Sequence, residues 1–192
     1  AGIPAIILFG VSKHKDAIGS DAMQKTGLLH RMINIAKQAA PDVTVIADTC
    51  FCEFTDHGHC GVVTEINGQC DVDNDETLLN LQNQCVVAAK AGVDMIAPSG
   101  MMDGMIAAIR AGLDESGFNH IPVMSYSTKF ASAFYGPFRD AVGSAGNLGG
   151  GKIEGVRTFG QSNPKRDRSD RIILHERLQF GLLRRIQLRN DL

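Results

Sequence analysis

The sequence predicts an α/β fold made of about four successive strand–helix units, and three observations support this prediction. Short apolar runs, typical of strands buried on both faces, recur along the first two thirds of the chain. Longer segments with helical periodicity lie between these runs and end near glycine or proline. The composition, 44% apolar and 21% charged in 192 residues, is that of a globular domain with a hydrophobic core.

The elements can be assigned in order along the chain. The predicted strands cover residues 4–9, 43–47, 93–97 and 121–124. The predicted helices cover residues 27–39, 75–91 and 103–116, and a shorter one covers about 131–142. This alternation favours parallel strands joined by right-handed crossovers, so the candidate folds are a doubly wound sheet and a (β/α)₈ barrel.

Polar residues at the ends of the predicted strands favour the barrel. Asp48, Ser99, Ser125 and Lys129 all stand at or just beyond the carboxyl end of a strand. Barrel enzymes place their chemistry at that end. A complete barrel has eight strands in about 250 residues, so about four β/α units of a TIM-type barrel are expected here.

The chain changes character near residue 146, which divides it into a partial barrel at 1–145 and a glycine-rich hinge with a basic tail at 146–192. Residues 1–151 hold nine Lys/Arg against sixteen Asp/Glu, whereas residues 152–192 hold ten against five. A basic amphipathic helix is predicted over 172–188. Such a tail could contact nucleic acid, but it lacks interleaved aromatic residues, so a solvated tail is favoured and no nucleic-acid partner is expected.

Membrane insertion and export are not expected either. No apolar run reaches the roughly 18–20 residues needed to cross a bilayer, and the first residues lack the basic region of a signal peptide. Five cysteines, three of them within eleven residues, suit a thiolate metal site in a reducing compartment better than a disulfide framework. We therefore expect a cytoplasmic protein without a membrane partner.

The strongest local motif is the segment from Asp48 to Gly61, in which Cys50, Cys52 and Cys60 follow a C-x-C-x₇-C spacing. Thiolates are soft ligands, and a loop can fold back so that all three meet one zinc ion. Three protein ligands leave a fourth position open, as in catalytic zinc sites. The alternative is that these cysteines are ordinary buried residues. Packing is the favoured explanation for the isolated cysteines, Cys70 and Cys85.

A second motif surrounds Lys129, which follows a predicted strand and is close in sequence to aromatic residues and Arg139. Desolvation and a nearby cation lower the pKa of a lysine, which leaves a neutral amine that can act as a nucleophile. On these grounds alone, a solvated surface lysine is the more frequent case.

Segments 48–61, 97–104 and 124–140 together resemble the porphobilinogen synthase (delta-aminolevulinic acid dehydratase) family of the zinc-cysteine type. They match its D-x-C-x-C…H-G-H-C-G loop, its A-P-S…M-D-G segment and its M-S-Y-S-T-K…F-Y-G-P-F-R-D segment in order and spacing. The resemblance covers about residues 1–145. Relative to the family, the chain is expected to be truncated at both ends.

The resemblance implies a TIM-barrel lyase of heme and porphyrin biosynthesis. Such a hydro-lyase condenses two 5-aminolevulinate molecules into porphobilinogen with loss of two waters. It implies that Lys129 forms a Schiff base and that Arg139, with Tyr135 and Phe138, binds the substrate. Asp48 and Ser99 would line the same pocket, and Cys50, Cys52 and Cys60 would hold zinc. His57 and His59 are expected to support the loop rather than to bind metal.

The resemblance also implies a homo-oligomer, an octamer in the family, and magnesium as a further metal. Two features of the family are not found in residues 146–192: a second carboxylate-binding arginine segment and a second Schiff-base lysine after an apolar strand. An alternative function is therefore that of a catalytically inactive, zinc-binding truncated fragment of the same enzyme.

Overall fold

The computed structural model describes residues 2–66, 69–126 and 182–183 of the chain. In this part, a central sheet has the strand order β1 (Ala5–Leu8), β2 (Thr44–Thr49), β5 (Met95–Pro98), β6 (Val123–Met124) and β7 (Leu182–Leu183). Strands β1, β2, β5 and β6 run parallel to one another, with Ile7 opposite Ile46 and Ala47 opposite Ile96. The predicted parallel sheet is confirmed in this part of the chain.

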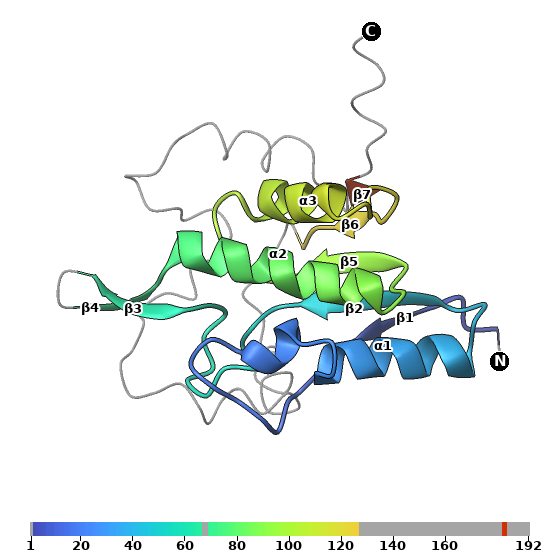
Figure 1. The fold of residues 1–192 in the computed structure, drawn as a ribbon, viewed down its shortest axis with the longest axis horizontal. Coiled ribbons are helices and arrows are strands. Elements are labelled where there is room, and N and C mark those ends of the chain that lie inside the picture. The colour runs from blue at the N-terminus through green and yellow to red at the C-terminus, as the bar shows by residue number, and fades with distance from the viewer. Residues whose placement is uncertain (1, 67–68, 127–181, 184–192) are drawn as a thin grey trace, which may run out of the picture.

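Three helices lie along one face of the sheet: α1 (Leu28–Ala39), α2 (Asn74–Lys90) and α3 (Met105–Glu115) (Figure 1). Each agrees with its predicted range to within two residues at either end. Each also connects one strand to the next parallel strand, which is the repeating unit of a (β/α)₈ barrel. The helix predicted over 131–142 lies outside the described residues.

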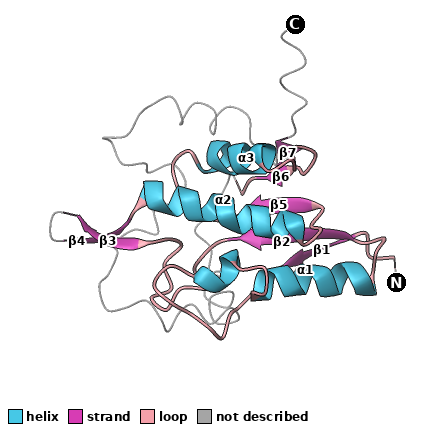
Figure 2. Cartoon of the chain, in the orientation of Figure 1, coloured by secondary structure: helices cyan, strands magenta, loops and turns pink. Residues whose placement is uncertain are grey.

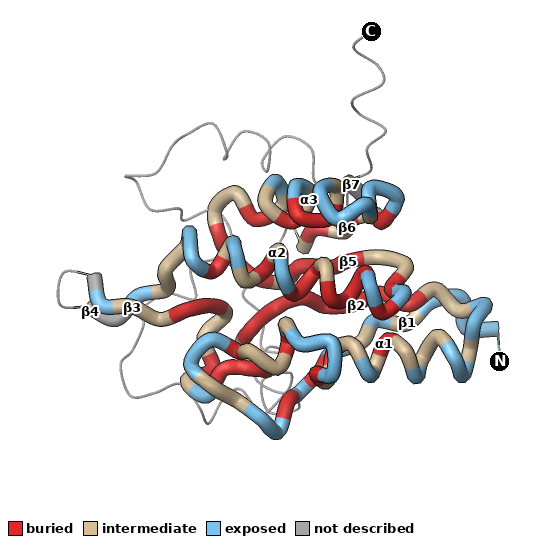
Figure 3. Tube along the Cα trace, in the orientation of Figure 1, coloured by how far each residue is buried: buried red, intermediate tan, exposed pale blue. Residues whose placement is uncertain are grey.

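The hydrophobic core lies between the helices and the sheet. Residues with fully buried side chains come from both layers: Leu29, Ile33, Val45, Leu81, Ile96, Ile109 and Leu113. Strand β2 is the most completely buried strand, since every residue from Val45 to Thr49 is buried (Figure 3). Because successive side chains of a strand point to opposite faces, Val45 and Ala47 face the helices and Asp48 faces the other side.

A hairpin that the sequence analysis did not predict separates β2 from α2. Strands β3 (Val63–Ile66) and β4 (Gln69–Val72) pair antiparallel and extend away from the main sheet (Figure 2). The sequence does contain a hairpin signal, because Asn67-Gly68 is a favoured two-residue turn. The backbone amide of Asp73 donates to the carbonyl of Val62 over 2.8 Å and closes the base of the hairpin.

The prediction of a helix over 172–188 is wrong where the structure can test it. Leu182 and Leu183 form β7, which pairs antiparallel with β6 opposite Met124 and Val123. This pairing has a physical reason, because it gives the backbone of β6 a hydrogen-bonding partner on the edge away from β5. The rest of the predicted hinge and tail lies outside the described residues. In the described part, no helix has the length and apolar character to cross a membrane.

Candidate metal centre

The cysteine loop begins where β2 ends, at the carboxyl edge of the parallel strands. Asp48 and Thr49 are the last residues of β2, and the chain turns sharply after Phe51. The amides of Phe54 and Thr55 both donate to the Phe51 carbonyl over 2.8 Å, which closes this turn. The side chain of Phe51 is fully buried and anchors the loop in the core.

The three predicted thiols converge. The sulfur atoms of Cys50, Cys52 and Cys60 all lie within 4.8 Å of one another, and those of Cys50 and Cys52 are 3.4 Å apart. All three cysteines are reduced. Sulfurs bound tetrahedrally to one metal ion at about 2.3 Å lie about 3.8 Å from each other, so this spacing suits a shared ion. The cluster could therefore hold a metal ion, as the sequence predicted.

Contacts from α2 hold the loop in place. The side-chain amide of the buried Gln84 donates to the Cys50 carbonyl over 3.1 Å. The Val62 amide donates to Thr77 Oγ1 over 3.0 Å, just beyond the third cysteine. Only glycine fits at position 61, between Cys60 and Val62, because a Cβ there would lie only 2.4 Å from Thr77 Oγ1.

The His57 ring contacts backbone groups and the His59 ring stacks on it, and neither belongs to the thiol cluster found among the described residues. His57 Nδ1 accepts a hydrogen bond from the His59 amide over 3.1 Å, so its Nε2 carries the proton that is donated to the Ala17 carbonyl over 3.0 Å. The two rings stack with centroids 5.3 Å apart. Both ring nitrogens of His57 are thus occupied, which agrees with the predicted loop-supporting role.

Asp48 lies beside the cluster and is almost completely buried, with 6% of its surface exposed. Burial, followed by the charges of Cys50 and Glu53, raises the pKa of Asp48 well above its ordinary value, while a hydrogen bond with the Ser99 side chain lowers it. Its Oδ1 atom has no hydrogen-bond partner among the described residues. The predicted pair Asp48 and Ser99 is therefore brought together, with one carboxylate oxygen left available.

The thiols influence each other's ionisation. For Cys50, a hydrogen bond with Cys52 lowers the pKa, but the hydrogen bond with Cys60 and burial outweigh it and raise the pKa to about 12. Hydrogen bonds with Cys50 and Cys60, then burial, raise the pKa of Cys52. Both thiols are therefore protonated at neutral pH when no metal is bound, and a metal ion must displace their protons.

Besides Gln84, sequence reasoning missed two titratable residues near the cluster. Glu53 is 4% exposed, and its Oε2 accepts a hydrogen bond from Cys52 Sγ over 3.0 Å. Burial, then the charge of Cys50, raises the pKa of Glu53 to about 7. Burial, then the charge of Asp48, raises the pKa of Tyr126 to about 12. Only Tyr126 could have been found from the sequence, because it belongs to the segment that precedes Lys129. Glu53 carried no such signal, since an acidic residue next to a cysteine is usually exposed.

Four predicted site residues lie outside the described part of the chain: Lys129, Tyr135, Phe138 and Arg139. Of the other two cysteines, Cys85 is fully buried in the hydrophobic core, which confirms its predicted packing role. The side chain of Cys70, in β4, is outside the described residues.

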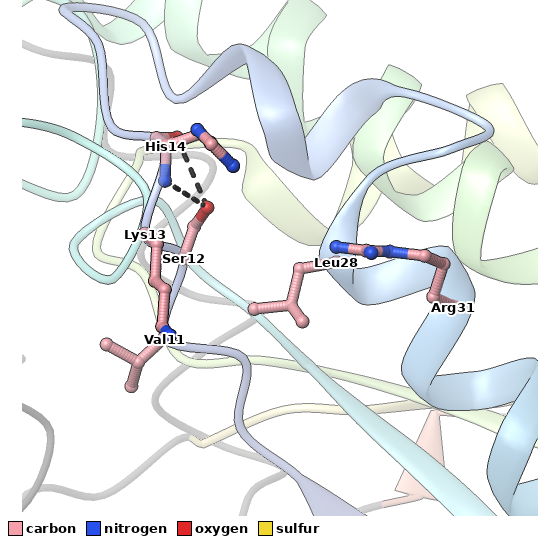
Figure 4. A pocket seen from close by; sticks show the side chains of 6 residues that line it. All are labelled: Val11, Ser12, Lys13, His14, Leu28 and Arg31. Carbon is pink, nitrogen blue, oxygen red and sulfur yellow. Dashed lines mark hydrogen bonds between the residues drawn. The ribbon is translucent and has the colours of Figure 1, made fainter.

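A separate hollow of about 330 Å³ lies between the segment after β1 and the first turns of α1. Figure 4 shows Leu28 and Arg31 of α1 on one side of it, with Val11, Ser12, Lys13 and His14 on the other. Ser12 Oγ accepts from the His14 amide over 3.0 Å and lies 2.7 Å from Asp21 Oδ2. Among the residues that the structure describes, no predicted site residue lines this hollow.

Comparison with known proteins gives a consistent result. The family model of delta-aminolevulinic acid dehydratase matches residues 1–169, which extends past the boundary at 145 drawn from motifs. The delta-aminolevulinic acid dehydratase of Escherichia coli K12 is 54% identical over 164 residues, which are 85% of this chain and 47% of that protein. The protein of the same description from Halalkalibacterium halodurans C-125 is 60% identical over 144 residues, 75% of this chain and 43% of that protein.

A solved structure shows which fold the chain shares. The delta-aminolevulinic acid dehydratase (porphobilinogen synthase) of Toxoplasma gondii ME49, crystallised with the reaction product porphobilinogen, superposes with a TM-score of 0.74 at 38% identity. The match covers 89% of this chain and 47% of that one. The chain thus spans about half the length of the relatives it matches. The predicted fold, a partial barrel of this type, is confirmed.

Proposed function

Because this chain belongs to the delta-aminolevulinic acid dehydratase family, we propose that it acts in the reaction that condenses two 5-aminolevulinate molecules into porphobilinogen. The reaction loses two waters. The observation that carries the proposal is the convergence of three thiols beside Asp48 at the carboxyl end of β2. The product bound to the Toxoplasma gondii relative supports the same substrate class.

The metal in this proposal is zinc, held by Cys50, Cys52 and Cys60. Three thiols at mutual distances below 4.8 Å form a soft donor set that suits zinc, and three protein ligands leave a position for substrate or water. When bound, zinc supplies a Lewis acid that polarises an oxygen atom of the substrate. The magnesium site implied by the family resemblance remains a prediction.

The chain's own residues supply binding and covalent chemistry. Lys129 is proposed to attack the ketone of 5-aminolevulinate as a neutral amine, forming an imine and releasing one water. Arg139 is proposed to bind the substrate carboxylate, since a guanidinium offers paired donors. Tyr135 and Phe138 would complete the substrate pocket.

Asp48 and Ser99 are proposed to face the same substrate. The Ser99 side chain hydrogen bonds to the Asp48 carboxyl and restricts its orientation. Asp48 Oδ1, which lacks a partner among the described residues, is then available to accept a hydrogen bond from an amine or hydroxyl group of the substrate. The two residues would therefore orient the reacting group beside the thiols.

The cellular setting follows from the same chemistry. Reduced thiols at the centre of the site fit a reducing compartment, so we assign the protein to the cytoplasm. A homo-oligomer is proposed from the family resemblance, with the octamer as its expected form.

The test is porphobilinogen formation by the purified chain with zinc and 5-aminolevulinate. We expect product with the unmodified chain and none with Lys129→Ala, which removes the amine, or Cys52→Ser, which removes one thiolate. Borohydride reduction in the presence of substrate should add the mass of one reduced substrate at Lys129. A Lys90→Ala variant, changed at the end of α2, is the matched lysine control and should keep full activity.

A negative result in this test would overturn the proposal. If the chain binds zinc but forms no product and no adduct at Lys129, the proposed activity is overturned. The chain would then be a zinc-binding partial barrel without catalysis, which is the alternative function.

A further inference from the structure

Two buried polar side chains of α2 bind the two ends of the cysteine loop. Thr77 and Gln84 are both 0% exposed. Thr77 Oγ1 accepts a hydrogen bond from the Val62 amide over 3.0 Å. Gln84 Nε2 donates to the Cys50 carbonyl over 3.1 Å. One helix therefore binds the loop at its first cysteine and just after its last one, Cys60.

The spacing of the two residues lets them act from one face of the helix. Thr77 and Gln84 are seven positions apart, which is close to two turns, so their side chains point the same way and lie about 10 Å apart along the axis. The loop between Cys50 and Val62 has turns but no helix or strand element of its own. The helix can therefore fix a distance between the two ends that the loop alone does not fix.

The chain after the last cysteine is held closely against the start of α2. Besides the amide bond to Thr77, the Val62 carbonyl accepts a hydrogen bond from the Asp73 amide over 2.8 Å, so both of its backbone polar groups are bound. Gly61 lies so near that a Cβ there would be 2.6 Å from Thr77 Cγ2. Little room is left for this end of the loop to shift.

Gln84 is a polar residue at a core position. Its Oε1 atom has no hydrogen-bond partner among the described residues, and burying such an atom is costly. Its neighbours on the same helix, Leu81 and Cys85, belong to the hydrophobic core. Only the amino end of the Gln84 side chain can bind a carbonyl, so the bond to Cys50 sets its orientation. Holding the loop explains a polar side chain at this place.

We propose that Thr77 and Gln84 are positioning residues of the metal centre, which hold Cys50 and Cys60 at the spacing that one metal ion requires. The proposal rests on the proposed metal-binding function of the three thiols. Both bonds are made to backbone groups of the loop and include no sulfur atom, so they are the same whether the thiols carry protons or bind a metal. Residues that support metal ligands in this way typically contribute 10–100-fold to metal affinity.

Substitutions of similar shape test the two bonds. Thr77→Val and Gln84→Met each remove one hydrogen-bonding group, and we expect zinc affinity to fall about 10–100-fold in either variant. Thr77→Ser keeps the hydroxyl acceptor, and we expect affinity within about threefold of the unmodified chain. Affinity is measured by competition with a chromogenic chelator. The thiolate-to-cobalt absorption of the Co²⁺-loaded chain reports how many sulfurs bind.

A measurement on the metal-free chain tests the anchoring bond itself. Hydrogen exchange of the Val62 amide, followed by nuclear magnetic resonance, should become faster in Thr77→Val, because this amide loses its acceptor. In Thr77→Ser the amide should stay protected.

A control variant tests whether lost stability alone could explain a lower affinity. Asp94 binds Lys37 and the Val45 amide near the start of β2, at the opposite end of the strand from the loop. Asp94→Ala should therefore lower the melting temperature of the metal-free chain without changing zinc affinity or the cobalt spectrum. Circular dichroism of each variant checks that it is folded.

Four results would overturn the proposal. If Thr77→Val and Gln84→Met bind zinc as tightly as the unmodified chain, with the same cobalt spectrum, α2 does not position the cysteines. If Thr77→Ser loses as much affinity as Thr77→Val, the hydroxyl acceptor is not the cause. If Asp94→Ala loses as much affinity as these variants, reduced stability explains the effect. If the unmodified chain binds neither ion, the proposed metal centre itself fails, and the positioning role fails with it; the other three results concern α2 alone.

Discussion

Strands β1 and β2 are neighbours in the same sheet but lie in very different surroundings. Along β2, every residue from Val45 to Thr49 is buried, whereas the residues of β1 alternate between exposed and half-buried. Ile7 of β1 and Ile46 of β2 are register partners, yet Ile7 is 40% exposed and Ile46 is 9% exposed. Three more apolar residues next to β1 are exposed: Ile3, Phe9 and Val11.

The difference separates a buried strand inside the described sheet from a partly exposed strand at its edge. Around β2, helices cover one face of the sheet, β1 and β5 flank the strand, and the metal loop starts from this buried position. At β1 the sheet ends with an apolar edge, whereas parallel strands are normally covered on both faces. The metal loop can therefore be held in place by the buried strand β2 even though the edge strand β1 is exposed. Five measurements can test this contrast between β2 and β1.

The largest expected effect is the pH dependence of zinc binding. The raised pKa values of the Cys50 and Cys52 thiols mean that both are protonated below about pH 9, so zinc must displace two protons. Affinity should fall as pH falls, by about tenfold per pH unit for each proton, or about a hundredfold for two. Competition titrations at pH 6, 7 and 8 measure this slope. An affinity independent of pH would contradict the shared thiol site.

The second effect concerns the closed core. Ile96→Ala truncates a side chain with no exposed surface on β5, and we expect the free energy of unfolding to fall by about 2–5 kcal/mol. Urea denaturation monitored by circular dichroism measures it. A loss below about 1 kcal/mol would mean that the core around β2 and β5 is less closely packed than the structure indicates.

The third effect concerns the amino-terminal edge of β2. Asp94 Oδ2 accepts hydrogen bonds from the Val45 amide at 2.7 Å and from Lys37 Nζ at 2.9 Å. Because the Lys37 and Asp94 side chains are 27% and 38% exposed, solvent weakens the ion pair. Asp94→Ala should cost about 1–2 kcal/mol in the same denaturation assay. Lys37→Ala should cost less, since the bond to Val45 remains; equal losses would assign the effect to the ion pair instead.

The fourth effect is the capping of α2. The Asp73 side chain accepts a hydrogen bond from the Glu76 amide over 3.0 Å at the start of this helix. Asp73→Ala should lower the free energy of unfolding by about 1 kcal/mol, and Asp73→Ser should recover most of it because serine also caps helices. A serine variant no more stable than the alanine variant would exclude capping as the cause.

The smallest effect is expected at the open edge. Ile7→Lys changes a 40% exposed residue, so the free energy of unfolding should change by about 0.5 kcal/mol or less. The added charge should instead reduce self-association in sedimentation velocity, because charged residues discourage pairing at strand edges. A loss above about 2 kcal/mol would show that Ile7 is covered in solution and would remove the contrast with β2.

Much of the described fold could be predicted from the sequence because its signals are local. Continuous apolar runs such as 43–47 and helical periodicity such as 75–91 identified the parallel strands and their helices. The hairpin of β3 and β4 was missed because it interrupts the strand–helix alternation. The error at Leu182 and Leu183 has another cause: an amphipathic pattern cannot show which sheet edge will accept two leucines.

Some residues of the candidate site could likewise be predicted from the sequence, and others could not. The spacing of Cys50, Cys52 and Cys60 predicted a shared metal site, because three thiols on one short loop can meet without help from distant residues. Glu53 and Gln84 could not be predicted. Their roles depend on burial and on contacts between segments, since Gln84 lies 34 residues from the carbonyl it binds.

The hairpin of β3 and β4 also has a practical consequence. Its base is closed by the bond between the Asp73 amide and the Val62 carbonyl, and Glu65 on its outer part is exposed. A fluorescent label attached at Glu65→Cys would stand away from the sheet. Position 65 is nevertheless only four positions after Gly61, where the metal loop ends. The hairpin thus offers an attachment point for an optical sensor of metal loading.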